Sequence, residues 1–168
     1  MASREWNSRE AYLKMNFSIL AASLRDLGSL RRVEQACFPK DAWPLLDLIA
    51  VLTWPDVVRL KALLPDSQMI GFIAGNPRPS EKTAWIATLG VLPDYQRQGI
   101  GRALLRACEA QLFEERLKLC VRVSNESAIR LYEQEGYVAI DTWSKYYNDQ
   151  ENALVMEKIR QDHRLDPP

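Results

Sequence analysis

The chain has 168 residues, enough for one domain with a sizeable buried core. Hydrophobic residues make up 47% of it and charged residues 26%, proportions that are ordinary for a soluble globular protein. The formal net charge is zero, so the overall charge favours neither nucleic acid nor an anionic membrane as a partner. No apolar stretch approaches the roughly 18 residues that a membrane-spanning helix needs.

The cysteine and histidine content argues against several kinds of site. Cys37, Cys108 and Cys120 are odd in number and irregularly spaced, which fits neither a disulfide framework nor a zinc site. The single histidine, His163, lies near the C-terminus, so neither a metal site nor a serine–histidine nucleophile is expected. Residues 1–14 are polar and charged, without the apolar core of a signal peptide. We therefore expect a cytoplasmic protein without a metal ion.

The N-terminal part of the chain predicts a strand followed by two helices. The strand covers 16–22, and Asp26 is placed to cap a helix that runs to about Cys37. Apolar residues recur at helical spacing in this helix: Leu27, Leu30, Val33 and Ala36. A Phe-Pro pair ends it, because the residue before a proline disfavours the helical conformation. A second helix is predicted over 43–52.

Three strands follow these helices. The segments 57–64 and 68–74 predict a β-hairpin with a Pro-Asp turn. A loop is expected over 77–80, and the next strand over 83–91.

A glycine-rich turn follows the strand 83–91 and opens an amphipathic helix expected from Gly99 to about Arg116. Free N–H groups and the dipole at a helix start favour an anion, and Gly99 and Gly101 let the backbone approach it. The pattern therefore predicts a diphosphate site, although an ordinary strand-to-helix turn has the same pattern. Leu104 replaces the third glycine of a dinucleotide-binding motif, which argues against NAD. The expected buried face of this helix carries Ile100, Leu104, Ala107 and Cys108, and the outer face Arg102, Arg106 and Glu109.

The C-terminal part predicts a strand, a helix and two closing strands. The strand 117–124 alternates, with one face made of Leu117, Leu119, Val121 and Val123 and the other of Lys118, Cys120 and Arg122. Asn125 can cap a helix that ends before Gly136. The closing strands cover 137–147 and 153–159.

This order of elements predicts an α+β domain with a mixed, mostly antiparallel sheet of about six to seven strands and about four helices. We place a single domain at 15–160 and an N-terminal extension at 1–14. The remaining tail, 161–168, is expected to be disordered.

Two long motifs, 89–101 and 121–136, strongly resemble the GCN5-related N-acetyltransferase (GNAT) superfamily. The second motif reads V-R-V-S-N-E-S-A-I-R-L-Y and continues to a Gly-Tyr pair. Together with 145–147 and 152–156, it resembles the protein N-terminal acetyltransferases. Those relatives include the bacterial ribosomal-protein alanine enzymes and the eukaryotic enzymes that acetylate N-terminal methionine.

The resemblance implies a GNAT fold in which two central strands splay apart and bind acetyl-CoA between them. The pantetheine arm would pair with backbone groups of one strand, and the pyrophosphate would lie on the glycine-rich turn. The implied cofactor-binding residues are Leu89, Gly90, Val91, Arg97, Gln98, Gly99, Ile100, Gly101, Arg102 and Asn125.

The resemblance implies that Tyr132 is the catalytic general acid that protonates the departing sulfur. A tyrosine pKa of about 10 exceeds that of a thiol, about 8.5, so the hydroxyl carries its proton at neutral pH. No familiar proton acceptor for the amine is present. Cys120 occupies the position of a glutamate or histidine in the relatives, and Trp85 that of a tyrosine. A strand cysteine is usually a small buried hydrophobe, and an indole N–H only donates.

The resemblance also implies an acceptor site made by Phe38, Pro39, Tyr146 and Tyr147. A helix stop and ordinary sheet positions would explain the same residues without a role in binding. An α-amino group has a pKa of about 7.7–8.0 and a lysine side chain about 10.4, so the α-amine loses its proton more easily. We therefore expect acetylation of the N-terminal α-amino group of a protein or peptide, such as a ribosomal protein. The enzyme is expected to act as a monomer or dimer.

Two alternative functions fit the same motifs. An acetyltransferase for a small amine, such as a polyamine or an antibiotic, would need an acidic pocket, and the segments expected to line the site are not acidic. A catalytically weakened acetyl-CoA-binding module would explain why Cys120 and Trp85 replace ionisable residues.

Overall fold

The computed structural model describes residues 16–160, so the expected extension 1–14 and the tail 161–168 with His163 lie outside the described residues. In chain order the elements are β1 (Ser18–Ala21), α1 (Leu27–Cys37), α2 (Leu45–Thr53), β2 (Val58–Leu63), β3 (Met69–Arg78), β4 (Thr83–Val91), α3 (Ile100–Glu109), β5 (Arg116–Arg122), α4 (Glu126–Gln134), β6 (Val138–Trp143) and β7 (Ala153–Ile159).

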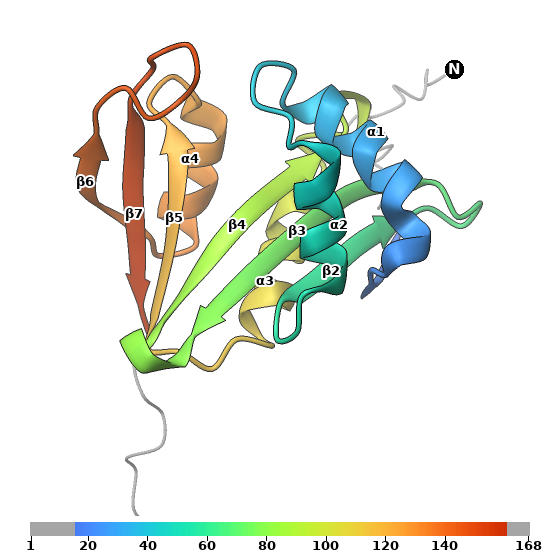
Figure 1. Ribbon diagram of the computed structural model, residues 1–168, viewed down its shortest axis with the longest axis horizontal. Coiled ribbons are helices and arrows are strands. Elements are labelled where there is room, and N and C mark those ends of the chain that lie inside the picture. Colours follow the sequence, from blue (N-terminus) through green and yellow to red (C-terminus); the bar gives the residue numbers. More distant parts are fainter. Residues whose placement is uncertain (1–15, 161–168) are drawn as a thin grey trace, which may run out of the picture.

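The seven strands form one sheet in the order β1-β2-β3-β4-β5-β7-β6. Every neighbouring pair is antiparallel except β4 and β5, which are parallel. Helices α1 and α2 cover β2, β3 and β4 on one face, and α3 and α4 lie on the opposite face (Figure 1). This arrangement confirms the α+β fold and the mixed, mostly antiparallel sheet expected from the sequence.

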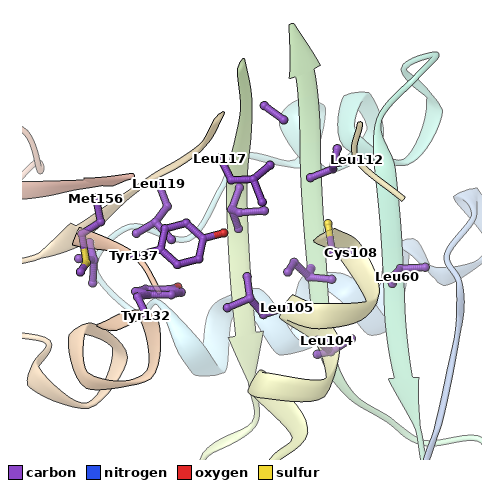
Figure 2. Close-up of a cluster of buried hydrophobic side chains, with 14 of the residues drawn as sticks. Leu60, Leu104, Leu105, Cys108, Leu112, Leu117, Leu119, Tyr132, Tyr137 and Met156 are labelled. Atoms are coloured by element: carbon purple, nitrogen blue, oxygen red, sulfur yellow. The ribbon is translucent and has the colours of Figure 1, made fainter. Parts of the chain in front are cut away.

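Apolar side chains fill the space between the sheet and the helices on both faces. The larger cluster lies under α3 and α4, and Figure 2 shows Tyr132 and Tyr137 side by side in it. The smaller cluster lies under α1 and α2 and contains Ala22, Leu30, Val33, Leu48, Val51, Leu52, Met69, Phe72 and Ala74. Because helices cover β3 on both faces, this strand is buried along most of its length.

The parallel strands β4 and β5 diverge halfway along their length. They pair only from Thr83 opposite Arg116 to Ile86 opposite Leu119. At this point the register between β3 and β4 shifts, so that Ala87 has no partner in β3. A β-bulge of this kind bends the strand that carries it. Figure 1 shows the two strands meeting at one end and opening toward the other, which confirms the expected splay.

The predicted end of helix α3 at Arg116 is wrong, because the helix stops at Glu109. The Arg160 guanidinium donates hydrogen bonds to the carbonyls of Glu109 and Leu112, which closes the helix end. The prediction that Glu109 faces outward is also wrong. Its carboxylate is buried and accepts hydrogen bonds from the Tyr137 hydroxyl at 2.8 Å and the Lys158 ammonium at 2.7 Å.

Helix α1 also departs from its predicted pattern. Ala36, expected on the buried face, is exposed, whereas Glu34 is buried. Asp26 directly precedes the helix, as expected for a cap, but no helix N–H donates to its carboxylate. That carboxylate instead accepts hydrogen bonds from the Ser23 N–H at 2.8 Å and the Lys61 ammonium at 2.7 Å.

Strand boundaries differ from the predictions at three places. Strand β3 continues to Arg78, into the expected loop 77–80, because it stays paired with the start of β4. Strand β5 ends at Arg122, which leaves Val123 exposed beyond the strand. Strand β6 ends at Trp143, so the residues that follow it belong to the β6–β7 loop, 144–152.

None of the helices in the described part of the chain is long and apolar enough to cross a membrane.

Candidate active site

A cavity of about 160 Å³ lies where β4 and β5 diverge. Both strands, helices α1 and α4, the α1–α2 loop (38–44) and the β6–β7 loop contribute to its wall. The lining residues are Glu34, Phe38, Asp41, Trp43, Ile86, Ala87, Thr88, Leu89, Leu119, Cys120, Val121, Arg122, Asn125, Ala128, Tyr132 and Tyr147.

The end of β4 has one free edge at this cavity. Residues Leu89, Gly90 and Val91 pair with β3 on one side, whereas β5 stops pairing with β4 at Ile86. A strand edge presents unpaired N–H and C=O groups that can bind another extended chain. A pantetheine arm, which carries two amides, fits such an edge.

The C-terminus of α1 packs closely against this edge. A Cβ atom added to Gly90 would lie 3.2 Å from the Cys37 sulfur and 3.2 Å from a ring carbon of Phe38. These contacts are tighter than ordinary van der Waals packing, so the absence of a side chain at Gly90 lets α1 approach β4. The approach places Phe38 in the wall of the cavity.

The start of α3 offers several free backbone donors. The first hydrogen bond of the helix runs from the Ala103 N–H to the Gly99 carbonyl at 3.0 Å, and no side chain caps the N-terminus. The N–H groups of Ile100, Gly101 and Arg102 therefore have no partner within the helix. Gly99 has a φ of +82°, a conformation that favours glycine. An exposed, uncapped helix start of this kind fits a pyrophosphate.

The side chains around this turn differ in their availability. Arg97, Gln98 and Gly99 are exposed, and the Ile100 side chain is buried in the core. The Arg102 guanidinium forms an ion pair with Glu135 at 3.0 Å and a hydrogen bond with Gln134, both at the end of α4. At the turn itself, Arg102 therefore contributes its backbone N–H.

Tyr132 reaches the cavity from helix α4. The Asn125 side chain caps this helix, as predicted, by accepting a hydrogen bond from the Ala128 N–H at 3.2 Å. The Tyr132 side chain is 7% exposed, and its ring packs edge-on against Tyr137 at 5.8 Å. Burial raises the pKa of Tyr132 to about 12, so its hydroxyl is protonated at neutral pH. Among residues 16–160, no group accepts a hydrogen bond from this hydroxyl.

Cys120 lines the same cavity, but its thiol is poorly suited to accept a proton. Burial raises its pKa above the ordinary value, although a hydrogen bond with the Tyr146 hydroxyl acts in the opposite direction. The thiol therefore stays protonated at neutral pH. Trp85 is outside the cavity wall, where its ring lies 6.0 Å from Trp143 and 5.9 Å from the Lys118 ammonium.

Arg122 connects the loops that frame the cavity. Its guanidinium binds Asp41 of the α1–α2 loop at 2.9 Å, and Asp149 and Glu151 of the β6–β7 loop at 2.9 Å and 2.6 Å. It also lies over the Tyr147 ring, 4.1 Å from the centroid. Burial disfavours its charge, but the three carboxylates outweigh this effect and raise the pKa of Arg122. This set of residues, the Arg122 cluster, holds both loops against β5.

The structure brings together only some of the residues predicted for acceptor binding. Phe38 and Tyr147 line the cavity, whereas Pro39 and Tyr146 are exposed and do not belong to its wall. Leu89, Asn125 and Tyr132 line it as well, while the glycine-rich turn lies outside it at the start of α3.

Several residues of the wall were not expected there from the sequence. These are Glu34, Asp41 and Trp43, and Arg122 had no role assigned to it. The expectation that the lining segments are not acidic is therefore wrong. A signal for Glu34 was present in the sequence, because Glu34 lies four residues after the buried Leu30, which places both on one helical face.

The sequence profile of the Acetyltransferase (GNAT) family matches residues 27–137. The chain belongs to this family, whose members use acetyl-CoA, and it is therefore an acetyl-CoA-dependent acyltransferase.

The relatives of the chain include acetyltransferases that act on protein N-termini. The catalytic subunit NAA10 of the Arabidopsis thaliana N-terminal acetyltransferase A complex is 30% identical over 147 residues, covering 83% of this chain and 76% of the relative. The [ribosomal protein bS18]-alanine N-acetyltransferase of Escherichia coli is 42% identical over 80 residues, covering 44% of this chain and 53% of the relative. The crystal structure of the ribosomal-protein-S18-alanine N-acetyltransferase from E. coli matches with a TM-score of 0.77 at 26% identity, covering 90% of this chain and all of that one.

Proposed function

We propose that this protein acetylates the N-terminal α-amino group of a protein or peptide in the cytoplasm, with acetyl-CoA as the acetyl donor. The observation that carries the proposal is a single cavity that joins the free edge of β4 to the protonated hydroxyl of Tyr132. The names of the relatives support the acceptor class, because one describes an N-terminal acetyltransferase and the other an enzyme that N-acetylates an alanine of a ribosomal protein. Three free thiols fit a reducing compartment.

The cofactor-binding residues are those at the two backbone features of the site. Leu89, Gly90 and Val91 offer the free strand edge to the pantetheine arm. The turn and the first residues of α3 offer backbone N–H groups and the exposed side chain of Arg97 to the pyrophosphate; these residues are Arg97, Gln98, Gly99, Ile100, Gly101 and Arg102. Asn125 keeps its side-chain amide group for the cofactor while its carbonyl oxygen caps α4.

Acetyl-CoA supplies an acetyl group activated by its thioester. The Tyr132 hydroxyl is protonated and lines the cavity where β4 and β5 diverge. It can donate its proton to the departing sulfur, because no described residue accepts a hydrogen bond from it. The backbone N–H groups at the end of β4 are fixed donors that can stabilise negative charge on the acetyl oxygen. The cavity orients the amine toward the thioester, which lowers the entropy cost of bringing the two together.

The acceptor is proposed to enter between the two loops that the Arg122 cluster connects. Phe38 would supply an apolar wall beside the first residue of the acceptor, and Tyr147 contributes a second aromatic ring to the same cavity. Pro39 and Tyr146, which are exposed at the rims of the same loops, would contact the acceptor outside the cavity.

A small amine is a second candidate acceptor, because two carboxylates line the cavity. Of these, Asp41 is paired with Arg122, so the carboxylate of Glu34 is the one left to attract a cation. A polyamine carries several cations along its length, and the single remaining carboxylate matches one of them. An N-terminal amine carries one charge and fits better.

The test measures thiol release from acetyl-CoA with three acceptors at equal concentration. The first is a lysine-free peptide with a free N-terminus, the second an N-acetylated peptide with one lysine, and the third a polyamine. The pKa of an α-amine is about 2.5 units below that of a lysine side chain, so a larger fraction of the α-amine is neutral at pH 7. The first peptide should therefore react at least tenfold faster than the second. Faster turnover of the lysine peptide or the polyamine would reject the α-amine assignment, and acetyl-CoA binding without turnover would indicate a binding module.

A further inference from the structure

Glu34 is a buried carboxylate at the C-terminal end of α1. Its side chain is 3% exposed, and it belongs to the helix face that packs on the sheet with Leu30 and Val33. Burying an ionisable side chain costs free energy unless a partner compensates it. In the described part of the chain, no ion pair involves this carboxylate, and the one compensating hydrogen bond comes from the Trp43 backbone N–H.

The surroundings of Glu34 are those of the reaction cavity. It lines the same wall as Thr88 of β4, next to the free strand edge, and Tyr132 of α4. The charged or titratable groups that share its surroundings are Cys37, Asp41, Cys120, Arg122, Tyr132 and Tyr147. Arg122 is the cation among them, and Asp41, Asp149 and Glu151 already occupy its donors. Glu34 is therefore the carboxylate of this cavity that remains available to a cation from outside.

The pKa of Glu34 also suits a group that accepts a proton. Burial raises the pKa of Glu34 to about 7, so a large fraction is deprotonated at neutral pH and can accept a proton. A general base works best when its pKa lies near the working pH. Burial also raises the pKa of the Cys120 thiol in the same cavity, but a thiol pKa ordinarily lies above 7, so this shift keeps Cys120 protonated and without basic character.

We propose that Glu34 accepts the proton of the acceptor's α-ammonium group, either directly or through one water molecule. This inference rests on the proposed function, and it supplies the proton acceptor that Cys120 and Trp85 cannot provide. The ammonium loses one proton to Glu34, which passes it to solvent. The C–N bond then forms as the C–S bond breaks, Tyr132 protonates the sulfur, and the second proton of the nitrogen restores Tyr132 through solvent.

The first test compares pH–rate profiles of wild type and Glu34→Gln with an alanine-initiated peptide. The glutamine keeps the shape of the side chain and an oxygen for the Trp43 N–H. We expect kcat/KM to fall about 100-fold at pH 7, in the range typical of a general base, and the acidic limb near pH 7 to disappear. Acetyl-CoA affinity should stay within twofold of wild type, about the scatter of a neutral change. An unchanged acidic limb in the variant would overturn the proposal.

Glu109→Gln is the matched control. Glu109 is also a buried carboxylate, but it lies in the core and binds Tyr137 and Lys158. This variant should keep the acidic limb even if its stability falls. If the acidic limb of the pH–rate profile disappeared in both variants, the loss of any buried carboxylate would explain it. That result would overturn the proposal for Glu34.

A second test does not depend on turnover. Carbon-13 NMR of glutamate-labelled protein follows the carboxyl signal that is missing in Glu34→Gln. We expect this signal to move when an alanine-initiated peptide with a free amino group is added, and to stay in place with the N-acetylated peptide. Equal shifts with both peptides, or none with either, would overturn the assignment of Glu34. Inactivity of the wild-type enzyme toward every peptide would instead reject the proposed function.

Discussion

The two faces of the sheet are built in different ways. On the side that carries α3 and α4, one side chain, Tyr132, is joined by backbone groups from short segments, namely the free edge of β4 and the uncapped start of α3. On the face that carries α1 and α2, the wall is assembled from side chains far apart in the sequence. Asp41 and Arg122, which bind each other there, are 81 residues apart.

This difference explains which parts of the site can change independently. Backbone donors at a strand edge and a helix start depend little on the neighbouring side chains, so the proposed cofactor contacts should tolerate side-chain substitutions there. The second face depends on particular charged residues and on two loops. We therefore expect variants on the first face to affect acetyl-CoA binding or protonation of the sulfur, and variants on the second to affect binding or deprotonation of the acceptor.

The largest effect is expected for Tyr132→Phe. The phenyl ring keeps the packing against Tyr137, while the proton for the sulfur is lost, so kcat should fall at least about 100-fold with little change in stability. Steady-state kinetics together with thermal unfolding measure both quantities.

Tyr137→Phe provides the control for Tyr132→Phe. It removes a buried hydrogen bond to Glu109, so it should lower the free energy of unfolding by about 1–3 kcal/mol and leave kcat nearly unchanged. A Tyr132→Phe enzyme with wild-type kcat would contradict the role of the hydroxyl.

The second effect concerns how the free energy of unfolding depends on pH. The pKa of Glu34 rises from 4.5 in the unfolded chain to about 7 in the folded one, so the folded state binds more protons between these values. The wild type should therefore lose up to about 3 kcal/mol of stability as the pH rises from 4.5 to above 7. Denaturant unfolding at pH 5 and pH 8 should show that Glu34→Gln lacks this loss. Equal pH dependence in wild type and variant would contradict it.

The third effect concerns the Arg122 cluster. Arg122→Gln leaves three carboxylates close together without their cation, so the free energy of unfolding should fall by about 2 kcal/mol and the KM for the peptide should rise. Chemical unfolding and peptide titration measure the two changes. The matched control is Arg130→Gln, whose side chain is 67% exposed in its pair with Glu126 and should change stability by less than about 0.5 kcal/mol. If both variants lowered the free energy of unfolding equally, Arg122 would contribute no more to stability than an exposed surface ion pair does.

The fourth effect is expected at the start of α4. Asn125→Ala removes the cap and should cost about 1 kcal/mol of stability, whereas Asn125→Asp keeps an acceptor for the Ala128 N–H. If the side-chain amide also binds the cofactor, both variants should weaken acetyl-CoA binding, which titration calorimetry measures. Wild-type affinity in both variants would show that Asn125 acts through the helix alone.

The smallest effect is expected for Cys120→Ala. A thiol that stays protonated contributes no base, so the activation free energy should change by less than about 0.5 kcal/mol. A loss of rate comparable with that of Glu34→Gln would show that Cys120 takes part in the proton transfer.

Local patterns predicted most of the fold. The alternation of Leu117, Leu119 and Val121 and the cap at Asn125 were expected from local spacing and are found in the structure. The divergence of β4 and β5 was expected from the resemblance to the GNAT superfamily, and the strand pairing confirms it. Where predictions failed, a distant partner decided the outcome. Arg160 ends helix α3, and Tyr137 with Lys158 turns Glu109 inward.

The acceptor side was harder to predict for the same reason. Asp41 acquires its role only from Arg122, and no local spacing reveals that pair. Glu34 was not singled out in the sequence, although its position four residues after Leu30 places it on the apolar face of α1.

A crystal structure with a bisubstrate analogue, in which coenzyme A is joined to the amino group of a peptide, would locate both substrates at once. We expect the pyrophosphate on the N–H groups at the start of α3, the sulfur within hydrogen-bonding distance of the Tyr132 hydroxyl and the peptide nitrogen in the cavity lined by Glu34. A ligand bound away from the diverging strands, or a sulfur that Tyr132 cannot reach, would contradict it.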